Sequence, residues 1–269
     1  MTFTQAHLLG IEHLHPSEIT VLLDLADQYV DLGRAKHKHS DALAGLTQVN
    51  MFFENSTRTQ ASFELAGKRL GADVMNMSMQ ASSIKKGETL IDTAMTLNAM
   101  HPDLLVVRHP HSGAVDLLAQ KVNCAVLNAG DGRHEHPTQA LLDAFSIQEK
   151  LGTVEGKKVV IVGDILHSRV ALSNIYCLQK LGAEVMVCGP STLIPKYIGE
   201  LGVKVSHNLR EALEWCDVAN VLRIQLERQD IKYFPSIREY SQYYGINKQL
   251  LDEVDNKKII IMHPGPINR

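Results

Sequence analysis

Apolar and polar positions along the chain follow two different periods. Residues 15–32 repeat apolar side chains every three or four positions, which is the pattern of an amphipathic helix, and Ser17 is its expected N-cap residue. Residues 46–53 instead read as a strand that ends in two apolar residues. The two periods therefore predict a chain that contains both helices and strands.

Segments of the two kinds then alternate to the end of the chain. The expected strands span residues 46–53, 72–77, 103–108, 124–129, 157–164, 183–189, 217–224 and 257–264. The further expected helices span residues 87–100, 113–121, 137–151, 168–182 and 209–216. This alternation predicts βαβ units and parallel sheets. We expect the α/β class, with two Rossmann-like three-layer α/β/α domains at residues 1–150 and 151–269 and an interdomain cleft.

Composition narrows the class of protein. Hydrophobic residues make up 45% and charged residues 21% of the 269 residues, as in an ordinary globular protein. The net charge is −3, whereas a protein that binds nucleic acid is more often strongly basic. The start of the chain does not have the pattern of a signal peptide, and no apolar run approaches the roughly 20 residues of a membrane span. The four cysteines form no C-x-x-C pair. We expect a cytoplasmic protein that binds neither nucleic acid nor membrane.

A polar segment follows the strand expected at residues 46–53 and begins an amphipathic stretch. This S-T-R-T segment consists of Ser56, Thr57, Arg58 and Thr59. A helix N-terminus offers unpaired N–H groups and about half a positive charge from the dipole. Hydroxyls and a guanidinium at that place predict a phosphate site, whereas an N-cap needs only one such side chain. A nucleotide site is disfavoured, because the glycine-rich fingerprints are absent from the sequence.

Further candidate residues follow the next expected strands. Arg108 ends the apolar run 103–108, and an arginine at the end of a buried strand usually meets an anion. His136 and Gln139 lie three positions apart across a helix start, so they can face the same side. His134 and His136 are separated by one residue without a third ligand nearby, which disfavours zinc.

The second half of the chain carries its own cations after strands. Arg169 lies at a helix start, and Arg223 precedes Gln225 at the end of a strand. Two arginines in such positions predict a second anionic ligand, and a dicarboxylate would suit bidentate pairs. The last strand runs into H-P-G-P, whose prolines fix a loop with carbonyls that can accept hydrogen bonds.

Seven segments, in chain order, resemble the catalytic chain of aspartate carbamoyltransferase, within the aspartate/ornithine carbamoyltransferase superfamily. They are "FFENSTRTQASFE", "SSIKKGETLIDT", "VVRHP", "NAGDGRHEHPTQALLD", "GDILHSRVA", "LRIQLER" and "MHPGPINR". S-T-R-T and H-P-T-Q are specific to carbamoyltransferases, while Arg169, R-x-Q and H-P-G-P point to the aspartate branch. The resemblance implies carbamoyl transfer from carbamoyl phosphate to L-aspartate in pyrimidine biosynthesis, without a metal or organic cofactor. It also implies a homotrimer with active sites between subunits.

The resemblance assigns roles in carbamoyl phosphate binding and catalysis. The S-T-R-T segment would bind the phosphate, and Arg108 would bridge the phosphate and the carbonyl oxygen. Thr59, Arg108 and His136 would polarise that carbonyl and stabilise the oxyanion. Gln139 would hold the carbamoyl NH2 group.

The remaining matched residues complete the two substrate sites. The backbone carbonyls of Pro264 and Gly265 would also hold the carbamoyl NH2 group. Ser82 and Lys86, which by themselves read equally well as part of a solvated basic loop, would reach in from a neighbouring subunit. The carboxylates of aspartate would be bound by Arg169, Arg223 and Gln225, together with Lys86.

The chain departs from the family pattern in two places, and two alternatives stay open. Some relatives carry leucine where Gly265 stands, which a backbone role should tolerate. The family's C-terminal helical segment is expected to be missing beyond Arg269. An ornithine carbamoyltransferase would share the carbamoyl phosphate half, although its usual signature is H-C-L-P. A non-catalytic subunit would serve a regulatory chain or dihydroorotase, which are also the expected further partners of an active chain.

Overall fold

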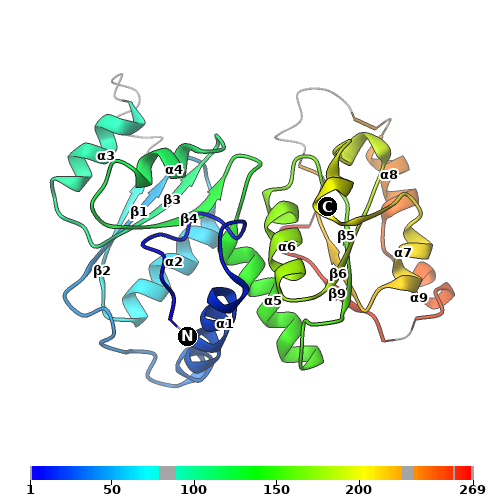
Figure 1. Cartoon of the computed structure of the whole chain (residues 1–269), viewed down its shortest axis with the longest axis horizontal. Helices are drawn as coiled ribbons and strands as arrows, with labels where there is room; N and C mark the ends of the chain where they lie inside the picture. The colour runs from blue at the N-terminus through cyan, green and yellow to red at the C-terminus, as the bar shows by residue number, and fades with distance from the viewer. Residues whose placement is uncertain (1, 79–88, 226–232, 235, 257, 268–269) are drawn as a thin grey trace. The chain divides into compact units, whose positions relative to one another are not determined.

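The computed structural model describes residues 2–78, 89–225, 233–234, 236–256 and 258–267. The chain forms two compact units, Met1–Thr138 and Gln139–Arg269, and each has a parallel sheet with helices beside it (Figure 1). The α/β class with two parallel sheets is therefore confirmed. The domain limit at residue 150 stays a prediction, because the two units divide earlier, within the first turn of a helix.

The first unit contains a four-stranded sheet of order β2-β1-β3-β4, in which every paired strand is parallel. Its strands are β1 (Thr47–Phe52), β2 (Asp73–Ser78), β3 (Leu104–His109) and β4 (Ala125–Asp131). Its helices are α1 (Pro16–Arg34), α2 (Thr57–Arg69), α3 (Leu90–Asn98) and α4 (Ala114–Ala119). The N-terminal segment adds one parallel bridge beyond β4, between Leu8 and Leu127.

Alternate side chains of this sheet enter two separate cores, as the period of two along a strand requires. One face packs Val49 and Leu105 against Leu97 of α3 and Leu118 of α4. The opposite face belongs to a smaller cluster, in which Phe52 and Val106 pack with Phe63 of α2. The sheet is thus covered by helices on both faces.

The second unit contains a five-stranded parallel sheet of order β7-β6-β5-β8-β9. Its strands are β5 (Lys158–Val162), β6 (Glu184–Cys188), β7 (Lys204–Ser206), β8 (Val218–Val221) and β9 (Ile260–Met262). Its helices are α5 (Pro137–Leu151), α6 (Arg169–Lys180), α7 (Leu209–Trp215), α8 (Ile237–Tyr244) and α9 (Lys248–Glu253). Val160 and Ala219 pack against α7 on one face, while Asn220 reaches Asp143 of α5 from the other face.

Among the described residues, the elements expected from the pattern are present, together with further short elements and one correction. The sequence reading did not include β7, α8 and α9, which are short or lack a buried face. The N-cap residue of α1 is His15 rather than Ser17, so that expectation was wrong. Pro16 begins the helix because it has no N–H to satisfy, and the Nδ1 atom of His15 accepts from the Ser17 N–H at 3.3 Å.

Strand order fixes where a ligand can bind in each unit. In open parallel sheets, ligands bind beyond the carboxyl ends of the strands at the point where the strand order reverses. The first sheet reverses between β1 and β3, and the second between β5 and β8. We call these the first and second switch points.

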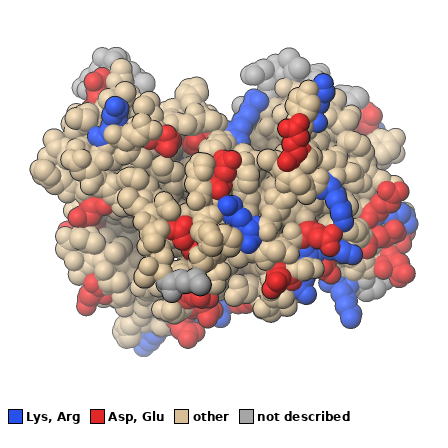
Figure 2. Space-filling view, in the orientation of Figure 1, with Lys and Arg blue, Asp and Glu red and all other residues tan. Residues whose placement is uncertain are grey.

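Charge and hydropathy add little to this picture. Lysine, arginine, aspartate and glutamate side chains are interspersed over the face shown in Figure 2. Within the described residues, no helix is both long and apolar enough to cross a membrane.

Candidate active site

The S-T-R-T segment lies at the first switch point, where β1 leads into α2. Ser56 is the N-cap residue, but its side chain makes no capping bond and its Oγ donates to Thr59 Oγ1 at 2.9 Å. Thr57 and Arg58 are exposed, and the first turn of α2, all of which is described, carries no acidic side chain. The positive end of this helix is therefore available to an anion, and the phosphate site expected there stays a prediction.

Arg108 lies at the end of β3, beside β1 in the sheet. Phe52 and Arg108 are register partners, so the arginine and the S-T-R-T segment leave neighbouring strands at the same edge. Its Nη1 donates to the Ala129 carbonyl at 3.0 Å, and its Nε lies 2.7 Å from Glu54 Oε1. The sequence analysis did not single out Glu54. The Arg108 guanidinium therefore contacts both a carbonyl and a carboxylate.

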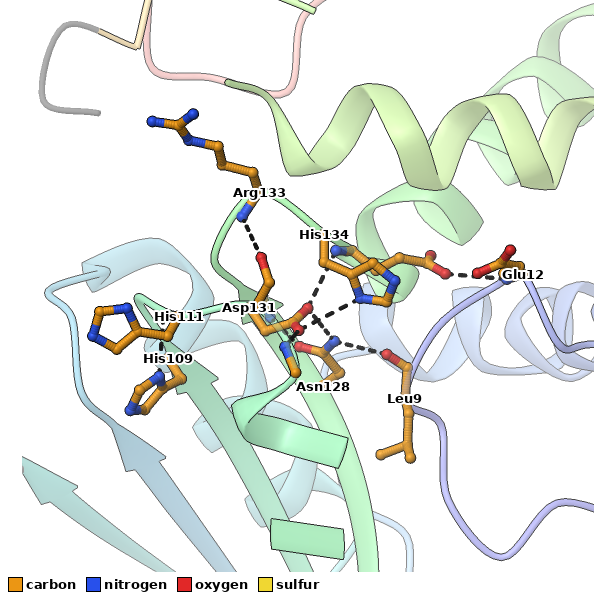
Figure 3. A network of polar contacts seen from close by, with 12 residues as sticks. Leu9, Glu12, His109, His111, Asn128, Asp131, Arg133 and His134 are labelled. Carbon is orange, nitrogen blue, oxygen red and sulfur yellow. Dashed lines mark hydrogen bonds and ion pairs between the residues drawn. The ribbon is translucent and has the colours of Figure 1, made fainter. Parts of the chain in front are cut away.

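His136 is carried by the loop between β4 and α5 and is buried, with 8% of its surface exposed. The Thr138 hydroxyl lies 3.4 Å from its Nδ1 atom. The loop is organised by Asp131, whose Oδ1 accepts from Asn128 Nδ2 at 2.8 Å and whose Oδ2 lies 3.5 Å from His134 Nδ1 (Figure 3). His134 therefore takes part in the hydrogen bonding of this loop. Within the described ranges, no group of residues could hold a metal ion.

The pKa values in this loop follow from those contacts. Burial tends to raise the pKa of Asp131, but donors from His134, Asn128 and the Gly113 N–H outweigh it and lower the pKa. The same contact with Asp131 raises the pKa of His134 against the opposing effect of burial. The pair thus favours an ionised carboxylate and a protonated imidazole.

Glu135, also missed by the sequence analysis, attaches this loop to the start of the chain. Its carboxylate accepts from the Ile11 N–H at 2.9 and 2.8 Å and from the Glu12 N–H at 3.1 Å. A Cβ atom at Gly10 would lie 2.3 Å from Glu135 Oε1, so only glycine allows this close approach. The residue next to His136 is thereby fixed from outside its own loop.

The second switch point contains Arg169 and Gln225. Arg169 is the first residue of α6 and is 2% exposed. Asp164, which follows β5, lies 2.7 Å from His167 Nδ1 through Oδ1 and accepts from the Gln225 N–H at 3.1 Å through Oδ2. Asp164 therefore links the loop after β5 to the loop after β8, in which Gln225 lies.

Arg223 and the H-P-G-P turn follow β8 and β9, which are neighbours in the sheet. Arg223 is half-buried, with Nη1 3.4 Å from the Ile224 carbonyl. In the turn, the Gly265 N–H donates to His263 Nδ1 at 2.7 Å. Gly265 has a φ of 65°, in the left-handed region that favours glycine, so a leucine here would strain the backbone. The tolerance expected from the sequence does not hold for this conformation.

Three predicted residues need separate mention. Gln139 lies in the first turn of α5, and its Nε2 donates to Asp143 Oδ1 at 2.9 Å. Asp143 is a third residue that the sequence analysis did not single out. Ser82 and Lys86 lie outside the described residues.

Comparison with known proteins agrees with this geometry. The family model "Aspartate/ornithine carbamoyltransferase, carbamoyl-P binding domain" matches residues 6–149, and the model "Asp/Orn binding domain" of the same family matches residues 155–269. The aspartate carbamoyltransferase catalytic subunit of Ruegeria pomeroyi is 65% identical over 269 residues, which are 100% of this chain and 86% of the relative. That of Cytophaga hutchinsonii is 65% identical over 263 residues, 98% of this chain and 85% of the relative.

Solved structures give the same result. The aspartate transcarbamoylase of Trypanosoma cruzi in complex with carbamoyl phosphate and aspartate has a TM-score of 0.84 at 32% identity, covering 99% of this chain and 87% of that one. Its complex with N-(phosphonacetyl)-L-aspartic acid has a TM-score of 0.83 at 32% identity, covering 99% and 86%. The chain belongs to the aspartate/ornithine carbamoyltransferase family.

Proposed function

We propose that the chain transfers the carbamoyl group of carbamoyl phosphate to the amine of L-aspartate, giving N-carbamoyl-L-aspartate and phosphate for pyrimidine biosynthesis. The observation that carries this proposal is Arg108 at the end of β3, beside the open N-terminus of α2. The high identity to aspartate carbamoyltransferase catalytic subunits supports aspartate as the acceptor. A cytoplasmic location stays a prediction.

In this proposal the first switch point binds carbamoyl phosphate. The S-T-R-T segment supplies hydroxyls, backbone N–H groups and the guanidinium of Arg58 to the dianionic phosphate. Thr59, Arg108 and His136 donate to the carbonyl oxygen, on which negative charge develops when the amine attacks. Preorganised donors of this kind each contribute about 2.7–4 kcal/mol in measured oxyanion holes.

The second switch point binds aspartate. Arg169, Arg223 and Gln225 bind its two carboxylates, and charge-assisted bidentate pairs select a dianion over a ligand with a cationic side chain. Gln139 and the carbonyls of Pro264 and Gly265 hold the carbamoyl NH2 group. The amine attacks directly, so the reaction needs no nucleophilic side chain.

Parallel assays with aspartate and ornithine test the reaction. Turnover with aspartate alone supports the proposal, and turnover with ornithine alone overturns it. Arg223→Ala should weaken the use of aspartate far more than the binding of carbamoyl phosphate. Equal loss of both would contradict the assignment of Arg223 to aspartate.

We also propose a homotrimer in which Ser82 and Lys86 of one subunit act in the site of its neighbour. A Lys86→Ala chain mixed with an Arg58→Ala chain should regain activity, because some sites of a hybrid trimer contain neither substitution. No recovery, with mixing verified by mass, would argue against shared sites. A regulatory chain or dihydroorotase as a further partner stays a prediction.

A further inference from the structure

Asp143 is a buried carboxylate that no step of the proposed reaction uses. It lies on α5, one helical turn after Gln139, and is 5% exposed. Its two oxygens accept from three amide groups of the second unit: Gln139 Nε2 at 2.9 Å, Asn174 Nδ2 at 2.8 Å and Asn220 Nδ2 at 3.0 Å. Burying a carboxylate is costly unless it is hydrogen-bonded, and among the described residues three side-chain amides supply these bonds.

One of these amides has a fixed orientation. Asn174 Nδ2 donates to Asp143 Oδ2 and also to the Val170 carbonyl at 3.1 Å. A flipped Asn174 would place its oxygen against that carbonyl oxygen, so the NH2 group must face Asp143. Asp143 Oδ2 is therefore an acceptor, and the Asn220 Nδ2 contact at 3.0 Å uses the same oxygen.

The other oxygen of Asp143 then determines the orientation of Gln139. In the ionised carboxylate, Oδ1 is also an acceptor, so Gln139 must turn its NH2 group toward Asp143 and its carbonyl oxygen away from it. Burial raises the pKa of Asp143, and the donors Asn174, Gln139 and Asn220 oppose that rise. To accept from a carbamoyl NH2 group, the Gln139 side chain must point its carbonyl oxygen at that group. This is the orientation that Asp143 enforces.

We propose that Asp143 is a positioning residue, which holds Gln139 with its carbonyl oxygen toward the carbamoyl NH2 group of the substrate. Asn174 and Asn220, from α6 and β8, both donate to Oδ2 of Asp143, which leaves Oδ1 to Gln139. The inference rests on the proposed role of Gln139. It assigns no contact between Asp143 and substrate.

Asp143→Asn is the sharpest variant because it changes the size of the side chain very little. With Asn174 fixed as a donor, the new side chain must turn its oxygen toward Asn174 and its NH2 group toward Gln139. Gln139 then inverts and presents its own NH2 group to the substrate. We expect kcat to fall about tenfold, with less change in the KM for aspartate.

A double-variant cycle separates positioning from general stability. In a Gln139→Ala background, Asp143→Asn should change kcat by less than about twofold, because no amide remains to be inverted. A tenfold loss in both backgrounds would overturn the inference. Gln139→Ala with unchanged kcat and KM, in an enzyme active with aspartate, would instead remove the proposed role of Gln139 and the inference with it.

A reversal of sign gives an independent readout. Gln139→Glu places a second carboxylate against Asp143. In that background Asp143→Asn should raise kcat/KM, because the substituted amide can donate to the new glutamate, whose other oxygen faces the substrate. In the wild-type background the same substitution should lower kcat/KM. A lowering in both backgrounds would contradict the inference.

The thermal midpoint is measured for every variant. If Asp143→Asn does not fold, Asn174→Ala replaces it in the cycle, since Asn174 lies beside Asp143 and donates nothing to Gln139. We then expect a loss of about threefold in kcat that disappears in the Gln139→Ala background. A loss that persists there would overturn the inference.

Discussion

The two switch points hold their cations in different ways. In the first unit, Arg58 is exposed and the Arg108 side chain keeps 12% of its surface open while Glu54 contacts its Nε. In the second unit, Arg169 is 2% exposed, and Asp164 in the loop before its helix is fully buried. The first arrangement suits a site that exchanges one anionic partner for another, and the second suits a receptor that is formed in advance.

The largest effect should come from the first unit. Arg108→Ala removes the proposed charged donor to the carbonyl oxygen, and we expect kcat to fall about 10²–10³-fold. Steady-state kinetics with both substrates saturating measures it. Arg69→Ala, at the far end of α2, is the matched control and should behave as wild type. A kcat within about tenfold of wild type would remove Arg108 from the proposed oxyanion site.

The second unit should respond in KM rather than in kcat. Arg169→Met keeps much of the side-chain volume but removes the charge, so kcat/KM for aspartate should fall about 10–100-fold. Carbamoyl phosphate affinity, measured by calorimetry, should be unchanged. Parallel losses for both substrates would show that the two switch points do not divide the substrates between them.

Glu54→Gln tests the exchange of partners directly. Without the carboxylate, phosphate no longer has to replace an ion pair of Arg108. Inorganic phosphate should therefore bind about two- to fivefold more tightly, as expected for a partly exposed ion pair. The difference should shrink at high salt. Weaker phosphate binding would mean that Glu54 positions Arg108 instead of competing for it.

The smallest effect concerns stability and its pH dependence. Glu18 of α1 accepts from Thr4 Oγ1 at 2.6 Å and from the His15 N–H at 2.9 Å, and these bonds lower its pKa from 4.5 to about 2. A lowered folded-state pKa stabilises the fold above the unfolded value, and this contribution is lost as the pH falls through the folded value.

Glu18→Gln should therefore lower the thermal midpoint at neutral pH, and the difference from wild type should shrink as the pH falls from 4.5 toward 2. Glu214→Gln, at an exposed position of the second unit, is the control and should follow the wild type at every pH. A difference that does not change with pH would mean that Glu18 acts by packing rather than by charge.

Local pattern predicted much of this molecule, and long-range pairing accounts for most of what it missed. The helix starts at Thr57, Pro137 and Arg169 follow from cap residues and apolar periodicity, both of which are local. The partners Glu54 of Arg108 and Asp143 of Gln139 carry no such signal. From the sequence alone such a carboxylate is expected to be solvent-exposed, because only the fold shows which side chain it contacts.

Strand order was also beyond the sequence. Alternating segments predict parallel strands, but nothing local places β1 beside β3 or β5 beside β8. The Asp164 contact with the Gln225 N–H depends on that second pairing. Candidate residues could therefore be named from the sequence, while their grouping into two switch points required the structure.

The hydrogen bonds between Glu135 and the start of the chain have a consequence for folding while the chain is being synthesised. Ile11 and Glu135 are 124 residues apart, so Ile11 leaves the ribosome long before its partner exists. Contacts of such separation form late because the loop between them must close first. During synthesis, the loop that carries His136 should be the last part of the first unit to become fixed.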